Sequence, residues 1–466
     1  MARKSKPPTS TLNKPVSKTV GKPSFAQAAP TPDPTIFEVK HASDNEAYKE
    51  IDQLNKEHKI KPLPFHPPRG LPEPILTLQQ VLGDVDDAPP GVSDTAKQSI
   101  KTIQDTNKQI VFHALGDCGS TKGPKTQNEV VDKMLADFDE AHDMEVPKFH
   151  FLLGDVVYSF GEAQYYFDQF YDAYRDYPAP ILAAPGNHDG MVSPLAGAIS
   201  LDAFYRNFCA ERFVITPEAG GLTRTAQIQP GVFFTFEAPF VRILAIYSNT
   251  LEDPGVIADG NYTGIGNSQV TYLETALKRA KGFPGAVLIA DHHPPYTVSR
   301  HGWSVEMLKQ IDDACKAAGF WPHAFLSGHA HNYQRFTRTR GDGTQIPYIV
   351  CGNGGHGLQT LSKSGALRAP QIIQNGGDGS DQVVLESYDD KNYGYLRLIV
   401  DDQQLRIEYH PASDGGTTKT PDDSVTVNLR SRKLVHYTAN DLGHPARREA
   451  IADAKDQQEG RHKRKK

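Results

Sequence analysis

The chain has 466 residues, of which 38% are hydrophobic and 23% are charged, and its formal net charge is -6 at pH 7. This length accommodates two or three average domains, or one large α/β domain with tails. The mild negative charge excludes a chain-wide field that would attract nucleic acid or an anionic membrane surface. We therefore expect no membrane association, and no nucleic-acid binding beyond what short basic tails support.

The four cysteines lie far apart in the sequence and form no Cys-x-x-Cys pair. In a chain of this length, that spacing is typical of reduced thiols and not of a disulfide framework. No apolar run approaches the length of a membrane span, and the N-terminal residues lack the apolar region of a secretory signal. We expect a cytoplasmic protein, and organellar targeting by the N-terminal tail is the alternative.

The predicted domain begins late in the chain. Residues 1–106 are rich in proline and weakly periodic, so we expect a largely disordered tail and lead-in segment in which only residues 75–82 form a short helix. We expect one catalytic domain over residues 107–432 and a charged C-terminal tail over residues 433–466. The sequence does not reveal the oligomeric state.

Short apolar runs alternate with helix-like segments between residues 110 and 189. Strands are expected at residues 110–115, 149–153 and 180–184, and helices at 128–142 and 162–174. This rhythm of strand, turn and helix indicates a buried, largely parallel sheet. Further helices are expected near residues 200–208 and 268–281, and further strands at 232–236, 241–248, 286–290 and 324–326. Antiparallel strands of a second sheet are expected at residues 348–351, 393–400, 405–409 and 425–429.

Five short motifs place Asp, Asn, Tyr and His side chains beside glycines or a proline where strands end. They are Gly116-Asp117-Cys118-Gly119, Gly154-Asp155-Val156-Val157-Tyr158, Gly186-Asn187-His188-Asp189, His292-His293-Pro294 and Gly328-His329-Ala330-His331. The carboxyl ends of strands form the ligand crevice of open α/β sheets, so these distant motifs are expected to converge. Two ions close together need a bridging carboxylate, terminal ligands and an open position. One motif alone is typical of a cap or turn, but five in order predict a two-metal hydrolytic site.

The order of these motifs resembles the calcineurin-like metallophosphoesterase superfamily, over roughly residues 109–429. The resemblance implies an α/β (α+β) fold, which is a four-layer αββα sandwich of two mixed β-sheets flanked by helices. Most members carry Asp-x-His in the first motif, whereas this chain has Gly119 at the third position and Tyr158 three residues after Asp155. This exchange is similar to the purple acid phosphatase branch. The segment after Gly328 and the glycine loop at 352–355 are similar to that branch as well.

The resemblance also implies which side chains hold which ion. Asp155 would bridge the two ions; Asp117, Tyr158 and His331 would complete the first site, and Asn187, His292 and His329 the second. Tyrosine phenolate favours a trivalent ion, so we expect Fe(III) at the first site. The neutral donors of the second site suit Fe(II), Zn(II) or Mn(II). The family spacing His-x-Pro selects His292 in preference to His293.

The activity implied is hydrolysis of phosphate monoesters by metal-activated water attack at phosphorus, as in an acid phosphatase. The resemblance gives His188 a catalytic role, in which it contacts the phosphate and donates a proton toward the leaving group. Asp189 is expected either to orient His188 or to cap the following turn. A phosphodiesterase with the same two metals is one alternative. A non-catalytic metal-binding scaffold with basic tails is an alternative of a different class.

Four further residues follow the motifs and are candidates for the rim of the pocket, although charged loop residues are mostly solvated. They are Arg300, His301, Arg335 and His356. The long segment at residues 190–266 is expected to shape specificity, but no pattern within it indicates how. Because a fold does not determine a substrate, the natural phosphate ester stays open.

Overall fold

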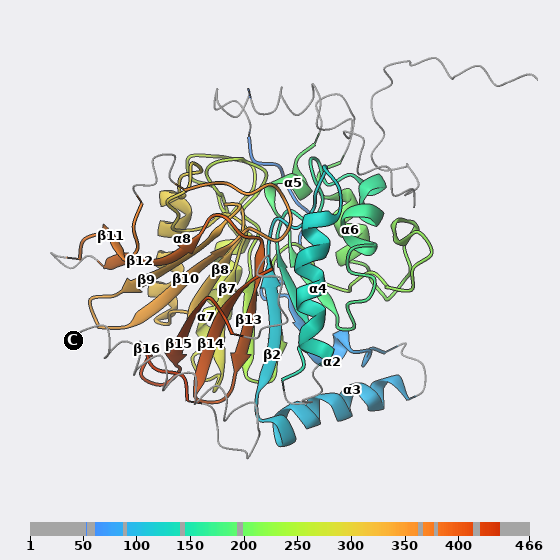
Figure 1. Ribbon diagram of the computed structural model, residues 1–466, viewed down its shortest axis with the longest axis horizontal. Helices are drawn as coiled ribbons and strands as arrows, with labels where there is room; N and C mark the ends of the chain where they lie inside the picture. Colours follow the sequence, from blue (N-terminus) through green and yellow to red (C-terminus); the bar gives the residue numbers. More distant parts are fainter. Residues whose placement is uncertain are drawn as a thin grey trace, which may run out of the picture.

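The computed structural model describes residues 53, 61–86, 91–139, 145–192, 199–361, 367–376, 381–412 and 420–438. Within these ranges, two mixed β-sheets pack face to face, and helices flank them (Figure 1). The predicted α/β four-layer sandwich is therefore confirmed. The first 52 residues, which were predicted to be disordered, lie outside the described residues. Most of the charged C-terminal tail lies outside them as well. No helix in the described part of the chain is long and apolar enough to cross a membrane.

The described residues contribute nine strands to one sheet and seven to the other. The larger sheet has the order β1 (Ile75–Thr77), β5 (Phe234–Ala238), β6 (Val241–Ala245), β7 (Ala286–Ala290), β8 (Ala324–Ser327), β10 (Gln345–Cys351), β9 (Tyr333–Thr339), β12 (Gln382–Asp389) and β11 (Gln371–Gln374). The smaller sheet has the order β16 (Lys433–Leu434), β15 (Asp423–Asn428), β14 (Gln404–Pro411), β13 (Gly394–Val400), β2 (Ile110–Leu115), β3 (His150–Leu153) and β4 (Ile181–Ala184). Neighbours are parallel from β2 to β4, and again from β6 through β7 and β8 to β10. Parallel neighbours end at one edge, where the motifs lie.

The helices flank the sheets and are short. They are α2 (Leu78–Val81), α3 (Val92–Lys101), α4 (Lys125–Asp139), α5 (Asn187–Gly190), α6 (Asp202–Phe208), α7 (Ser268–Ala280) and α8 (Val305–Ala318). The tighter or wider turns are η3 (Thr102–Asn107), η4 (Ala163–Tyr165), η5 (Phe167–Tyr171) and η6 (Pro217–Ala219). Helix α4 packs on the smaller sheet, where the Tyr395 hydroxyl of β13 donates to Asp137 at 2.8 Å. Helices α7 and α8 pack against each other beside the larger sheet.

Aromatic side chains from the two sheets meet between the layers. The rings of Phe151 in β3 and Phe234 in β5 have centroids 6.4 Å apart, and Phe149 meets Phe236 edge-on at 4.9 Å. All six residues of β2 are buried, as expected for a strand that is covered on both faces. Burial of these apolar faces is the dominant force that holds the sheets together.

Three expectations about strands and helices were wrong. The strand near residue 350 was placed with the later antiparallel strands, but β10 pairs parallel to β8 in the larger sheet, while β13 pairs antiparallel to β2. Residues 75–82 form β1 followed by α2, and β1 extends the larger sheet beside β5. Helix α3 was not predicted, although Val92, Ala96 and Ile100 lie on one face of it; Ala96 is its only fully buried residue.

The helix expected at residues 162–174 is instead the 3₁₀ turn η4 followed by the wide π turn η5. Gln169 lies in η5, and its side-chain amide binds the main chain of Tyr158 twice. The Tyr158 N–H donates to Oε1 at 3.0 Å, and Nε2 donates to the Tyr158 carbonyl at 3.0 Å. Such π turns are frequent at functional sites, and this one holds Tyr158 in place.

The burial of His150 should make the stability of the protein depend on pH. His150 is fully buried, and neither ring nitrogen has a hydrogen-bond partner within the described residues. Burial, aided by His113, lowers its pKa to about 3, whereas an unfolded histidine titrates near 6.5. Below pH ~6.5 the unfolded chain therefore binds a proton that the folded chain does not, and stability falls as the pH drops toward 3.

We expect His150→Leu to remove up to about 3 kcal/mol of the stability lost between pH 7 and pH 4. Urea unfolding at several pH values, with a chelator present for both proteins, measures this slope. Equal slopes for wild type and variant would contradict the assignment.

Candidate metal centre

Strands β2 and β3 each end at a glycine that is followed by an aspartate. Asp117 and Asp155 have positive φ angles of 56° and 53°, a conformation that is uncommon outside glycine. Both carboxylates are buried. Ligand atoms of Asp117, Asp155 and His292 all lie within 4.8 Å of one another. The structure thus brings the first, second and fourth motifs together at one point.

Tyr158 and His331 join Asp117 on one side of this cluster. The Tyr158 hydroxyl donates to Asp117 Oδ1 at 3.0 Å and lies 3.4 Å from His331 Nε2. His331 Nε2 is 3.3 Å from the same carboxylate oxygen, and its Nδ1 lies 2.9 Å from the Gly357 carbonyl. Burial, with Asp117 adding to it, raises the pKa of Tyr158 well above its usual value. The three residues predicted for the first ion therefore lie together.

The missing side chain at Gly119 has a steric reason. A Cβ atom there would lie 2.4 Å from Gln169 Oε1, 2.6 Å from the Val156 carbonyl oxygen and 3.2 Å from the Tyr158 ring. A metal-binding side chain at position 119 would need space that Tyr158 and Gln169 already fill. On its other face the Tyr158 ring stacks on His356, with centroids 3.7 Å apart.

Asn187 and His292 lie beside Asp155 on the other side of the cluster. His292 Nε2 is 3.0 Å from Asn187 Oδ1 and 3.3 Å from Asp155 Oδ2. Its Nδ1 lies 2.8 Å from the Leu153 carbonyl, which leaves Nε2 for the site. Burial alone would lower the pKa of His292, but Asp155 and Asp117 outweigh burial and raise it to about 10. The two carboxylates thus favour a positive charge at this point.

His293 is oriented away from these donor atoms. Its Nδ1 lies 2.7 Å from the Ser248 hydroxyl oxygen and its Nε2 lies 2.7 Å from the Leu251 carbonyl. Both ring nitrogens are therefore engaged in the loop after β6. This geometry supports the choice of His292 as the ligand.

His329 supplies a buried donor atom without a partner. Its main-chain N–H donates to Asp117 Oδ2 at 2.7 Å. Its Nε2 is buried and makes no hydrogen bond within the described residues. An unpaired buried imidazole nitrogen is costly, and a metal ion is the partner that such a nitrogen fits. Two buried carboxylates and this orphaned nitrogen form a donor set that fits cations.

His188 and Asp189 are held by different parts of the main chain. His188 Nδ1 lies 2.7 Å from the Ser159 carbonyl. Asp189 accepts the main-chain N–H groups of Val156 at 3.0 Å and Gly186 at 2.8 Å. Asp189 therefore ties together the turns that carry Asp155 and Asn187. Its role as a catalytic residue stays a prediction, and these contacts favour a positioning role.

The charge state of His188 depends on the carboxylates around it. Burial alone would lower its pKa, but Asp155 and Glu252 outweigh burial and raise it above 6.5. The main-chain N–H of His188 also donates to Asp155 Oδ1 at 2.9 Å. A histidine of raised pKa beside the cluster can hold a proton near neutral pH.

Two acidic residues at the site were missed by the sequence reasoning. Glu252 and Asp253 lie on the irregular loop that follows β6. Glu252 Oε2 is 3.4 Å from Asn187 Nδ2 and 4.0 Å from His188 Nε2, and Asp253 Oδ2 is 3.2 Å from His301 Nδ1. They follow no glycine motif, and their position in the long segment at 190–266 was the only signal.

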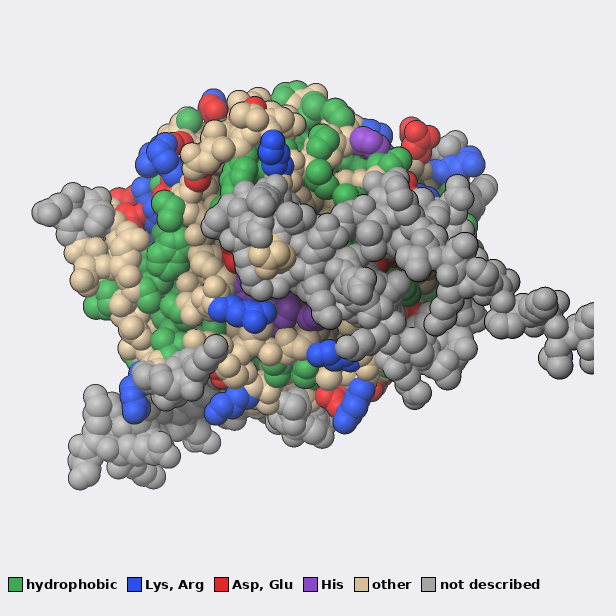
Figure 2. Space-filling model, turned by 90° about the horizontal axis from the view of Figure 1, so that it is seen from above, with side chains coloured by type: hydrophobic (Ala, Val, Ile, Leu, Met, Phe, Trp, Pro, Cys, Tyr) green, Lys and Arg blue, Asp and Glu red, His purple; other side chains and the backbone are tan. Residues whose placement is uncertain are grey.

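Two of the four rim candidates lie at the site and two do not. His301 is buried at the site, and His356 stacks on the predicted tyrosine ligand. Arg335 instead pairs with Asp423 of β15 through two contacts of 2.7 and 2.9 Å, and Arg300 is exposed. Viewed from above, histidine side chains gather near the middle of the face (Figure 2).

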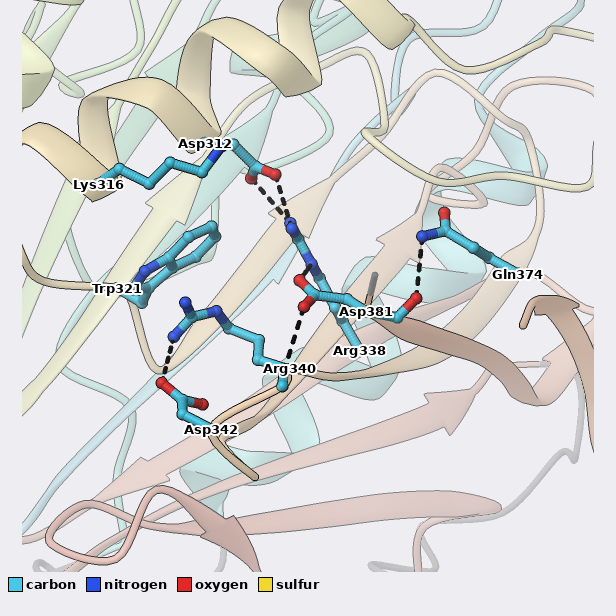
Figure 3. A pocket seen from close by; sticks show the side chains of 9 residues that line it. Asp312, Lys316, Trp321, Arg338, Arg340, Asp342, Gln374 and Asp381 are labelled. Carbon is cyan, nitrogen blue, oxygen red and sulfur yellow. Dashed lines mark hydrogen bonds and ion pairs between the residues drawn. The ribbon is translucent and has the colours of Figure 1, made fainter. Parts of the chain in front are cut away.

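A cavity of about 410 Å³ lies at the other end of β9 (Figure 3). Its two arginines are paired with carboxylates that line it as well. Arg338 lies between Asp312 and Asp381, with contacts of 2.6 and 2.7 Å, and Arg340 contacts Asp342 at 2.8 Å. These ion pairs leave the arginines engaged, so the cavity does not compete with the metal cluster as the candidate site.

Comparison with known proteins identifies a family. The model of the calcineurin-like phosphoesterase family matches residues 110–333. Three solved structures are similar in fold: GAP50, the anchor in the inner membrane complex of Plasmodium (14% identity, 69% of this chain and 88% of that chain, TM-score 0.43), PhoD (14%, 72% and 73%, 0.42) and a dimetal phosphatase from Danio rerio (10%, 68% and 98%, 0.40). TM-scores this low carry no information on activity. No curated protein sequence matches the chain.

The packing at Gly119 predicts the effect of adding one methyl group. We expect Gly119→Ala to displace Gln169 or Tyr158 and to lower the free energy of unfolding by about 1–3 kcal/mol. Urea unfolding of the chelator-treated protein measures this, with Gly282→Ala as the control because a Cβ there meets nothing within 4 Å. Equal stability of the two variants would show that the site accommodates a side chain at position 119.

Proposed function

Because residues 110–333 form a calcineurin-like phosphoesterase domain, we propose that the protein is a dinuclear-metal phosphoesterase that hydrolyses phosphate monoesters. One observation carries this proposal. Ligand atoms of Asp117, Asp155 and His292 lie within 4.8 Å of one another in a buried cluster. The other four predicted ligands, Tyr158, Asn187, His329 and His331, contact one of these three residues.

The residues divide into two groups around Asp155. Asp117, Tyr158 and His331 would hold the first ion, Asn187, His292 and His329 the second, and Asp155 would belong to both. When bound, the two cations would neutralise charge on the phosphate and make the attacking water more acidic. The protein contributes the fixed positions of these donors, because the strand ends and the turns tied by Asp189 hold them before substrate arrives.

His188 is the proposed proton donor. Its Nδ1 is engaged with the Ser159 carbonyl, and Nε2 is the ring nitrogen that we propose to face the leaving group. The raised pKa of His188 favours the protonated ring near neutral pH. Nε2–H can then give its proton to the leaving alkoxide as the bond to phosphorus breaks. Asp189 acts indirectly, because it fixes the turns on either side of His188.

The choice of monoesters is supported by charge. A phosphate monoester carries about two negative charges near neutral pH, and two cations with a protonated His188 match that charge better than they match a singly charged diester. A phosphodiesterase would use the same donors.

Aryl phosphate mono- and diesters, assayed side by side with metal-loaded protein, test the activity. We expect a kcat/KM at least about tenfold higher for the monoester, and a loss of about 10²-fold or more in Asp155→Asn, because one carboxylate would serve both ions. Asp313→Asn on the exposed face of α8 is the control. A clear diester preference would overturn the choice of substrate, and inactivity of metal-replete wild type would favour the scaffold.

The identity of the first ion is proposed from its ligands. Phenolate stabilises Fe(III), and Tyr158 already donates to Asp117, with which it would share the ion. We propose Fe(III) at the first site and Fe(II), Zn(II) or Mn(II) at the second. Metal analysis with a visible spectrum, repeated on Tyr158→Phe, tests this. We expect iron and a coloured wild type that loses its visible band in the variant, and a colourless wild type without iron would refute the assignment.

A further inference from the structure

The loop after β6 carries two carboxylates onto the open side of the second site. Asn249 anchors the loop through Leu63, whose N–H donates to Asn249 Oδ1 at 2.8 Å and whose carbonyl accepts from Asn249 Nδ2 at 2.9 Å. Glu252 and Asp253 follow within four residues. The two hydrogen bonds of Asn249 thus help to fix the position of both carboxylates.

Asp253 contacts two histidines with different oxygens. Oδ1 lies 3.6 Å from His329 Nε2, and Oδ2 lies 3.2 Å from His301 Nδ1. Ligand atoms of these three residues lie within 4.8 Å of one another. His301 holds one oxygen and leaves the other directed at His329.

The His329 atom that faces Asp253 Oδ1 is Nε2, which has no hydrogen-bond partner within the described residues. This nitrogen is buried, and the side chain is only 4% exposed. Two donor atoms about 2.1 Å from one ion are separated by about 3–3.5 Å in tetrahedral or octahedral geometry. The separation of 3.6 Å between Asp253 Oδ1 and His329 Nε2 is close to that range.

We propose that Asp253 would be a further ligand of the second metal ion, and that it would compete there with an oxygen of the substrate phosphate. The proposal rests on the two-metal function above and adds a competitor for phosphate within the chain. Glu252 strengthens the competition, because its Oε2 lies 3.4 Å from Asn187 Nδ2 and 4.0 Å from His188 Nε2. The loop thus offers carboxylate oxygens to groups that would otherwise meet phosphate.

Binding of zinc and of inorganic phosphate to the full-length chain tests the proposal without turnover. Metal-stripped wild type, Asp253→Asn and Asp253→Ala are titrated with Zn(II) by calorimetry. Asp313→Asn is the matched control, since it removes one carboxylate from the exposed face of α8. Circular dichroism checks that each variant is folded, and Asp253 is 40% exposed, so little packing is lost.

We expect two zinc ions per chain, with one of them bound at least about tenfold more weakly in both Asp253 variants and unchanged in Asp313→Asn. At saturating zinc, inorganic phosphate should bind the Asp253 variants at least threefold more tightly than wild type. Unchanged zinc affinity would overturn the proposal, as would three zinc ions per chain, which would make Asp253, His301 and His329 a separate site. If phosphate binds the Asp253 variants as tightly as wild type, or more weakly, the proposed competition between Asp253 and phosphate is wrong.

These outcomes are separable from a failure of the proposed function. If zinc binding depends on Asp253 but no phosphate ester is hydrolysed, the ligand assignment stands and the phosphatase proposal fails. If esters are hydrolysed while both zinc and phosphate bind the variants as they bind wild type, the phosphatase proposal stands and Asp253 is not a ligand.

Discussion

Asp117 and Asp155 place two carboxylates in the interior at the ends of adjacent parallel strands, and much of the surrounding structure compensates for that burial. Both residues, and His329 as well, adopt positive φ angles, each of which costs on the order of 1–3 kcal/mol outside glycine. Nearby glycines leave the space that these conformations need: a Cβ at Gly186 would lie 2.1 Å from Asp155 Oδ1. Strain and buried charge persist together because the two sheets hold the strand ends rigidly. A rigid set of donors is what two-metal chemistry requires.

The two sides of this cluster are built differently. On the first side, Tyr158 packs between Gln169, the main chain at Gly119 and the stacked ring of His356. The second side faces the loop of Glu252 and Asp253, which are partly exposed. On this second side, His188 Nε2 lies 4.0 Å from Glu252, so the proposed proton donor and the loop carboxylates are neighbours.

Short apolar strands that end at glycine and a polar residue predicted a parallel sheet and the convergence of the motif residues, whereas the sandwich was predicted from the resemblance of the motifs to a family. Membership of β10 and β13 in their sheets was predicted wrongly, since strand pairing depends on partners far along the chain. The roles of Glu252 and Asp253 could not be predicted, because an irregular loop has no periodicity that reveals where its side chains lie. Asp189 illustrates a subtler difficulty. Its place beside His188 in the sequence suggested a contact between them, whereas its carboxylate binds the main chain of Val156 and Gly186.

The proline-rich lead-in segment belongs to the framework of the site and does not merely precede the domain. Leu63 forms two hydrogen bonds with Asn249, 186 residues away in sequence. Phe65 packs edge-on against Tyr247, with ring centroids 5.9 Å apart, and Arg69 donates to the carbonyls of Cys209 and Gln229 at 3.0 and 2.8 Å. Because Asn249 lies only three residues before Glu252, a shift of the lead-in segment would move the acidic pair relative to the metal ligands. The balance between the loop carboxylates and phosphate thus depends on a segment that contributes no ligand itself.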